Sequence, residues 1–227
     1  MSLPDCGPEQ DAAGFVLAGG QSSRMGGDKA LVQFAGQPLI ERALGILREA
    51  GLRASIAGAR SPLTAYAAVV EDRESGPGPG LGPLGGVCAA LTSTSAQHAV
   101  FLPVDLPLLP GSLVAFLLDH ARITGAAVTL PSVNGFTQTF PAVVQRMALP
   151  ALETRLRDGQ GGCLKAFEAA AAQLGLPFSV LPVELLVQSG HIAHPDSLPA
   201  SLWFLNVNGP GELARAQTLF SAFHRVS

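Results

Sequence analysis

Four short apolar runs restrict the possible folds of this chain more than any other feature of its sequence. Each run is apolar throughout instead of alternating with polar residues, which is typical of parallel strands buried on both faces of a sheet. The runs are Gly14–Leu17, Ala54–Ala57, Ala99–Leu102 and Ala126–Leu130. Stretches with helical periodicity separate them, at Pro38–Ala50, Leu84–Leu91 and Pro110–Ile123. Because strands and helices alternate, we expect an α/β fold with an open, doubly wound parallel sheet.

The second half of the chain does not continue this regular alternation. The pattern predicts an extended segment at Phe136–Val144, helices at Ala148–Arg157 and Gly162–Leu174, and strands at Phe178–Pro182 and Trp203–Val207. A final helix is expected from Pro210 to about His224, with Glu212 in its first turn beside the positive end of the helix dipole. Residues 1–13 lack a basic region followed by an apolar one, so we interpret them as a flexible tail and not as a secretory signal.

Composition excludes several classes of protein. The 227 residues, 48% of them hydrophobic, can bury the core of one large domain. With 14% charged residues and a net charge of −3, no broad basic face is expected for nucleic acid, and no apolar run is long enough to cross a membrane. The chain has three cysteines, Cys6, Cys88 and Cys163, and no CxxC pair. An odd number of widely spaced cysteines favours a reducing compartment. We therefore expect a cytoplasmic protein.

The segment from Leu17 to Lys29 directly follows the first buried strand and is the strongest functional motif. Ligands of open α/β sheets bind at the carboxyl ends of strands, where this segment should lie. It contains Gly19, Gly20, Gly26 and Gly27, together with the cations Arg24 and Lys29. Glycines allow the backbone N–H groups to approach phosphate oxygens, and the cations offset the charge of a triphosphate. The segment is not a Walker A loop, because that motif requires Gly-Lys-Ser/Thr and here Asp28 precedes Lys29.

A second glycine-rich tract, Ser75–Gly86, alternates glycine with proline. It formally matches the G-x-G-x-x-G dinucleotide motif between Gly80 and Gly85, but no strand runs directly into it as that motif requires. The composition predicts a surface loop. Two functions stay open for it, namely a loop that closes over bound ligand and an inert connection.

Asp105 is the candidate metal ligand. It follows the apolar run Ala99–Leu102 at the predicted carboxyl end of that strand, where an unpaired carboxylate is costly. Mg²⁺ typically uses one or two protein carboxylates together with water and substrate phosphates, so Asp105 suits a metal that bridges a nucleotide. The alternative is that Asp105 caps the helix that begins near Pro110. His191 and His194 have helical spacing, but Pro195 follows them, which favours a polar loop over a metal site.

Three motifs in order resemble the molybdenum cofactor guanylyltransferase family of nucleotidyltransferases. They are Leu-Ala-Gly-Gly-x-Ser-x-Arg-Met-Gly-x-Asp-Lys from Leu17, Pro-Val-Asp-Leu-Pro from Pro103, and Asn206-Val207-Asn208 before the last helix. The resemblance implies a single three-layer Rossmann-like domain with a mostly parallel, mixed β-sheet. It also implies transfer of GMP from GTP to molybdopterin, a phosphorylated pterin, with Mg²⁺. Residues 14–227 would form the domain, 14–130 binding nucleotide and 131–227 the acceptor.

The resemblance also implies roles for individual residues. The residues expected to contact the nucleotide are Leu17, Ala18, Gly19, Gly20, Lys29, Asp72 and Asp105. The expected catalytic residues are Arg24, Lys29 and Asp105, and Asp105 is also the expected metal ligand. The residues expected to contact the acceptor are Asn206, Asn208 and Lys165.

The chain departs from the family pattern at three places. Ala57 stands where relatives often have asparagine; Gly209 and Gly211 replace a threonine and a glutamate after Asn208; and Lys165 is the only cation in the segment corresponding to a basic acceptor site. Two alternatives therefore stay open. One is a cytidylyltransferase acting on a related pterin, and the other is a non-catalytic nucleotide-binding regulator.

Overall fold

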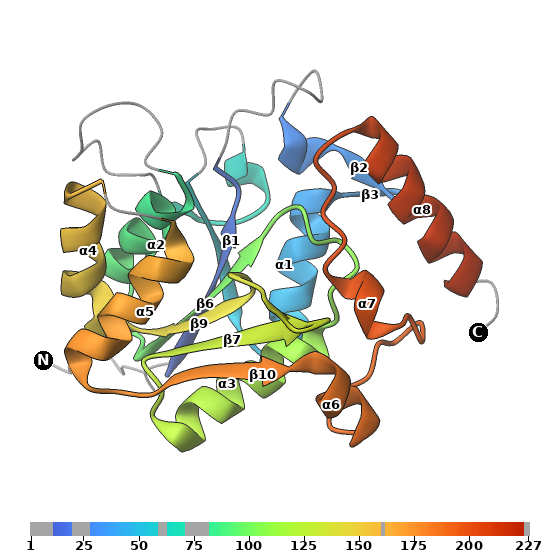
Figure 1. Ribbon diagram of the computed structural model, residues 1–227. Helices are drawn as coiled ribbons and strands as arrows, with labels where there is room; N and C mark the ends of the chain where they lie inside the picture. The colour runs from blue at the N-terminus through green and yellow to red at the C-terminus, as the bar shows by residue number, and fades with distance from the viewer. Residues whose placement is uncertain (1–10, 20–27, 59–62, 71–81, 160–161, 225–227) are drawn as a thin grey trace, which may run out of the picture.

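The central element of the protein is a mixed sheet with strand order β10-β7-β9-β6-β1-β4-β5, in which β8 pairs with β7 (Figure 1). The computed structural model describes residues 11–19, 28–58, 63–70, 82–159 and 162–224. The strands of this sheet are β1 Ala12–Leu17, β4 Arg53–Ala57, β5 Val69–Val70, β6 His98–Pro103, β7 Val128–Val133, β8 Phe136–Thr137, β9 Ala142–Gln145 and β10 Phe178–Pro182. A separate hairpin joins β2, Gln33–Phe34, to β3, Gln37–Pro38.

The sheet is parallel except where β8 and β9 enter it. β1 pairs in parallel with β4 and β6, β4 with β5, and β7 with β10. β9 lies between β6 and β7 and is antiparallel to both, and β8 is antiparallel to β7. The expected mostly parallel, mixed sheet is therefore confirmed, and the carboxyl ends of β1, β4 and β6 meet at one edge.

Helices cover both faces of the sheet, which gives the expected three layers. The helices are α1 Leu39–Glu49, α2 Gly82–Ser93, α3 Gly111–Thr124, α4 Leu149–Arg157, α5 Cys163–Leu174, α6 Val183–Gln188, α7 Ala200–Trp203 and α8 Pro210–His224. Val16 of β1 faces the core shared with α1 and α3, whereas its neighbours Phe15 and Leu17 face the core shared with α2, α4 and α5. Successive side chains of a strand point to opposite faces, so an apolar run such as β1 is buried on both.

Most predicted elements are confirmed to within three residues. The expected extended segment Phe136–Val144 is two short strands, β8 and β9, and three further expectations need correction. Trp203–Val207 is not a strand: Trp203 ends α7, and the residues that follow are irregular. Trp203 and Val207 are apolar because their side chains insert into the core, where they are 1% and 0% exposed. Gly82–Gly86 do not belong to a surface loop, because α2 begins at Gly82. Pro83 is tolerated in the first helical turn, where its missing N–H has no intrahelical partner.

The third correction concerns the start of the domain. β1 begins at Ala12, so Ala12 and Ala13 belong to the sheet instead of the expected tail, while residues 1–10 lie outside the described part. Three short 3₁₀ helices, η1 Lys29–Leu31, η2 Leu63–Ala65 and η3 Arg146–Ala148, complete the elements. Among the described residues, no helix is both long and apolar enough to cross a membrane.

Candidate active site

The carboxyl ends of β1, β4 and β6 are held together by backbone hydrogen bonds. Ala18 N–H donates to the Ala57 carbonyl at 3.0 Å, and Val104 N–H donates to the Leu17 carbonyl at 3.2 Å. These bonds place the segment after Leu17 directly beside the segment that carries Asp105. The edge predicted from the order of strands is therefore formed.

Gly19 lies where the backbone after β1 passes very close to the backbone after β4. A Cβ atom added to Gly19 would lie 2.7 Å from the Gly58 carbonyl oxygen, a contact that real Cβ atoms do not make. Gly58 itself has φ +76°, in the left-handed region that favours glycine. The sequence predicted that Gly19 allows close approach to a ligand; the structure adds that close approach of two strand ends already requires a glycine here.

Lys29 begins a short 3₁₀ helix, η1, that Asp28 caps. Asp28 Oδ1 accepts a hydrogen bond from Ala30 N–H at 3.0 Å, which satisfies a donor at the start of the turn. Asp28 therefore has a local structural task, fixing the turn from which the Lys29 side chain extends.

Two residues from distant parts of the sequence, Asp105 and Asn208, contact the Lys29 ammonium and form the Lys29 cluster with it. Lys29 Nζ donates to Asp105 Oδ2 at 2.8 Å and to Asn208 Oδ1 at 2.7 Å. The side chains of Lys29 and Asp105 are 16% and 21% exposed, so the ion pair is partly shielded but open to a ligand. The structure thus brings together one predicted residue from each of the three sequence motifs.

The Asn206–Asn208 segment is positioned by its central residue. Val207 is fully buried, and its N–H donates to the Asp105 carbonyl at 3.0 Å. Asn206 and Asn208 flank it and are both exposed. The two amides thus remain available at the surface beside the Asp105 segment.

Asp105 does not cap the following helix. The residue before α3 is Pro110, and no side chain caps this helix. The carboxylate pairs with Lys29 instead, so the alternative interpretation is wrong. Within the described residues there is no group of three or more His, Cys, Asp or Glu side chains that could hold a metal ion. A single partly exposed carboxylate fits the way in which Mg²⁺ binds, with few protein ligands and the remainder from water and phosphate.

Some of the other predicted site residues lie outside the described part of the chain, and the rest lie elsewhere on the molecule. Gly20, Arg24 and Asp72 lie outside the described residues. Lys165 is exposed in the first turn of α5. Ala57 is fully buried at the end of β4 and offers no polar side-chain atom.

The side chains of His194, Cys88 and Cys163 are buried. His194 is buried in a loop, and its Nδ1 accepts a hydrogen bond from Asp196 N–H at 3.0 Å, which confirms the predicted loop. Burial raises the pKa of Cys88 to about 12 and the pKa of Cys163 to about 11. Neither thiol is activated as a nucleophile.

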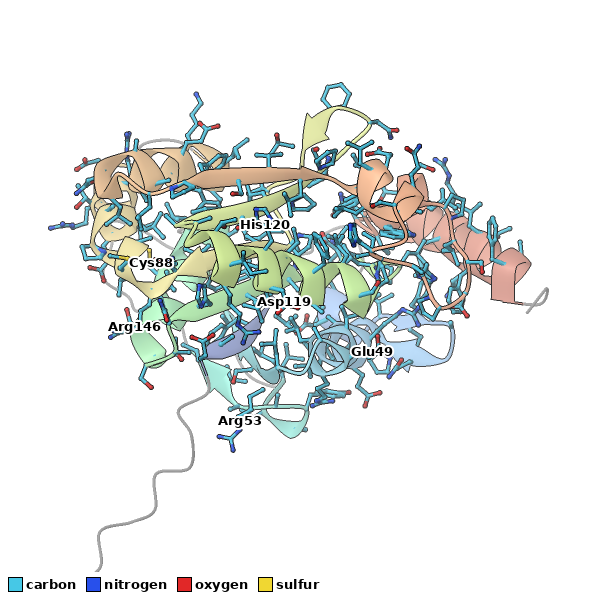
Figure 2. The ribbon with its side chains drawn as sticks, turned by 90° about the horizontal axis from the view of Figure 1, so that it is seen from below. Glu49, Arg53, Cys88, Asp119, His120 and Arg146 are labelled. Carbon is cyan, nitrogen blue, oxygen red and sulfur yellow. The ribbon has the colours of Figure 1, made fainter. Side chains whose placement is uncertain are left out.

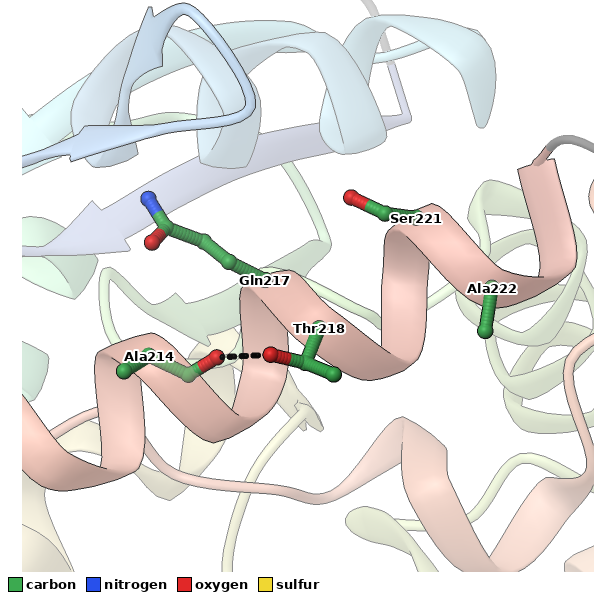
Figure 3. A pocket seen from close by; sticks show the side chains of 5 residues that line it. All are labelled: Ala214, Gln217, Thr218, Ser221 and Ala222. Carbon is green, nitrogen blue, oxygen red and sulfur yellow. Dashed lines mark hydrogen bonds between the residues drawn. The ribbon is translucent and has the colours of Figure 1, made fainter.

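Figure 3 shows a pocket along α8 that lacks the features of a phosphate site. Its lining residues are Ala214, Gln217, Thr218, Ser221 and Ala222. None of these side chains is cationic, so this pocket does not suit a triphosphate. Figure 2 shows the molecule from below, at the amino ends of the parallel strands, where Glu49, Arg53, Asp119 and Arg146 lie. The Lys29 cluster belongs to the opposite end.

Comparison with known proteins decides the family. The family model "MobA-like NTP transferase domain" matches residues 14–174. A molybdenum cofactor guanylyltransferase from Vibrio cholerae is 30% identical over 227 aligned residues, covering 99% of this chain and 98% of that protein. The chain belongs to the molybdenum cofactor guanylyltransferase family. It is therefore a nucleotidyltransferase, as its three motifs predict.

Solved structures agree with the fold of this guanylyltransferase-family protein. Molybdopterin-guanine dinucleotide biosynthesis protein A from Archaeoglobus fulgidus superposes with a TM-score of 0.70 at 22% identity, covering 92% of this chain and 99% of that one. A Mycobacterium tuberculosis protein in complex with manganese superposes with a TM-score of 0.61 at 18% identity, covering 91% and 98%.

One contact beside the Lys29 cluster was not predicted from the sequence. The N–H of Asn208 donates to Glu212 Oε2 at 2.8 Å. Glu212 was recognised only as an acidic residue near a helix dipole. The signal that could have found this bond is its spacing, since a glutamate in the first helical turn commonly accepts a bond from the backbone just before the helix.

Proposed function

We propose that this protein transfers GMP from GTP to the terminal phosphate of molybdopterin and releases pyrophosphate. The observation that supports this most directly is the cluster of Lys29, Asp105 and Asn208 at the carboxyl ends of parallel strands, in a chain of the guanylyltransferase family. A cation, a carboxylate and an amide at this position match the needs of a reaction between two phosphorylated substrates.

The reaction needs no protein nucleophile. A terminal phosphate oxygen of the acceptor attacks the α-phosphorus of GTP, a new P–O bond forms, and the bond from the α-phosphorus to the pyrophosphate oxygen breaks. Catalysis then consists of positioning and of offsetting charge. Lys29 contributes an ammonium to the phosphates, and Arg24 is proposed to contribute a second cation.

Asp105 is the residue proposed to hold a divalent metal, Mg²⁺ in the cell. When bound, the metal would offset negative charge on the phosphates. Because Asp105 already pairs with Lys29 at 2.8 Å, the carboxylate and the ammonium are adjacent, and both would face the same phosphate groups. The ion pair also holds the carboxylate in one place before substrates bind.

The remaining predicted residues are proposed to select the substrates. Leu17, Ala18, Gly19 and Gly20 would approach the base and phosphates through their backbone, and Asp72 would contact the nucleotide. Asn206, Asn208 and Lys165 would contact the acceptor phosphate. Because Ala57 offers no polar atom, we expect GTP to be preferred over other triphosphates only modestly; an apolar wall discriminates by about 1–3 kcal/mol.

Pyrophosphate release tests the proposal. The purified protein is mixed with each of the four nucleoside triphosphates and Mg²⁺, with and without molybdopterin, and Asp105→Asn serves as the inactive control. We expect the fastest release with GTP and molybdopterin together. Faster transfer with CTP would contradict the guanylyl assignment, and no triphosphate consumption with molybdopterin would contradict the acceptor.

A further inference from the structure

Two backbone hydrogen bonds fix the segment that carries Asn208. Val207 N–H donates to the Asp105 carbonyl at 3.0 Å, and Asn208 N–H donates to Glu212 Oε2 at 2.8 Å. The first bond ties the segment to the β6 end of the site. The second ties it to α8. Only the second involves a side chain, so it is the one that mutation can remove cleanly.

Glu212 holds the start of α8 in place of the usual cap. Serine, threonine, asparagine and aspartate are the common residues before a helix, but Gly209 stands there and has no side chain. Glu212 is the acidic residue of the first turn, where the helix dipole favours a carboxylate. Its carboxylate reaches back past Gly209 and accepts the Asn208 N–H, so a residue outside the cluster determines where Asn208 lies.

α8 is itself fixed to the segment that follows Lys29. Gln217 Nε2 donates to the Gln33 carbonyl at 3.1 Å, and the rings of Phe34 and Phe220 lie 5.6 Å apart. The Arg42 guanidinium lies over both rings, 5.1 Å and 4.7 Å from their centroids. Figure 1 shows α8 beside β2 and β3. These contacts hold α8, and with it Glu212, in a fixed position.

We propose that Glu212 is a positioning residue for nucleotidyl transfer: it orients Asn208, and through the 2.7 Å contact of Asn208 with Lys29 it orients the ammonium. This inference rests on the proposed function for its catalytic consequence. Glu212 does not touch the substrates in this proposal. It acts only by holding the Asn208 backbone.

A double-mutant cycle on turnover tests the proposal. Glu212→Ala should lower kcat by about tenfold, with a change of KM below about threefold, because misplacing a contact group by 1 Å can cost up to about a hundredfold. Asn208→Ala should lower kcat at least as much. In the Asn208→Ala background, Glu212→Ala should cost less than about twofold more, since interacting residues are not additive. Independent, multiplying effects would overturn the proposal.

A second variant separates positioning from helix stability. A Cβ at Gly211 meets nothing within 4 Å, so Gly211→Ala should fit and should stabilise the first turn of α8. Added to Glu212→Ala, it should restore the melting temperature without restoring kcat. Recovery of kcat by Gly211→Ala would mean that Glu212 acts only through helix stability. Glu168→Ala removes an exposed carboxylate from α5 and should leave kcat unchanged.

Amide hydrogen exchange gives a readout that does not depend on catalysis. In ¹⁵N-labelled protein, Glu212→Ala should speed exchange of the Asn208 amide by about tenfold, because a charge-assisted hydrogen bond is lost. Glu212→Gln, which keeps an acceptor oxygen, should show a smaller change. Unchanged Asn208 exchange in Glu212→Ala would overturn the positioning role, whether or not GTP and molybdopterin prove to be the substrates.

Discussion

Replacing Asp105 with asparagine should separate catalysis from folding. The new side chain has nearly the same shape, and its amide oxygen can still accept a hydrogen bond from Lys29 Nζ, which also keeps its 2.7 Å contact with Asn208. What is lost is the negative charge. The ion pair is 16% and 21% exposed, so water screens part of its energy. Exchanging a charged for a neutral hydrogen bond should then cost about 1 kcal/mol of unfolding free energy.

The loss of activity should be much larger than the loss of stability. Removing the carboxylate proposed to hold the metal should lower kcat by about 10²-fold or more, which corresponds to about 2.7 kcal/mol in the barrier. A destabilisation of about 1 kcal/mol shifts the melting temperature by only about 2–4 °C for a chain of this size and leaves nearly all of the protein folded.

The assay compares the melting temperature with steady-state pyrophosphate release for the parent and Asp105→Asn. Asp119→Asn is the matched control, because Asp119 is an exposed carboxylate paired with Arg122 on α3, away from the Lys29 cluster. It should keep full activity. A rate for Asp105→Asn within threefold of the parent, with unchanged dependence on Mg²⁺, would refute the assignment of Asp105.

Three further predictions concern the site and the core. Lys29→Ala should weaken GTP binding or slow transfer, and Lys29→Arg should recover only part of the loss because a flat guanidinium replaces a compact ammonium; unchanged calorimetric affinity together with unchanged turnover would exclude the role. Gly19→Ala should lower the melting temperature and activity together, because its Cβ would lie 2.7 Å from the Gly58 carbonyl oxygen; a fully stable, fully active variant would contradict this. Burial is the main cause that lowers the pKa values of His98 and His194, so the unfolded chain binds protons more readily. Stability should be complete above about pH 6.5 and should fall below it, by up to about 1.4 kcal/mol per pH unit and residue. His98→Gln with His194→Gln should flatten the melting temperature between pH 7.5 and 5.5, and an unchanged slope would exclude these histidines as the cause.

The sequence by itself determined the layers of the fold and predicted where the candidate site lies. Continuous apolar runs such as β1 and β6 can only be buried on both faces, and the polar residues that end them must then lie at one edge of the sheet. Asp105 was found in this way, and Lys29 was found in the glycine-rich segment that follows the first run. Asn208 was found through the family resemblance. The family resemblance followed from the same segments.

Only the tertiary structure decided how these residues meet and which apolar segments are strands. Lys29 and Asn208 are 179 residues apart, and no local pattern reports their 2.7 Å contact. Trp203–Val207 has the composition of a strand, yet Trp203 ends a helix and Val207 makes a single backbone bond to Asp105 beyond the end of β6. Buried residues are apolar whatever their backbone conformation. An apolar segment therefore predicts burial, but it does not predict whether the segment forms a strand or which segment it contacts. The bond from Asn208 to Glu212 likewise depends on where α8 packs, which contacts with the β2–β3 hairpin determine.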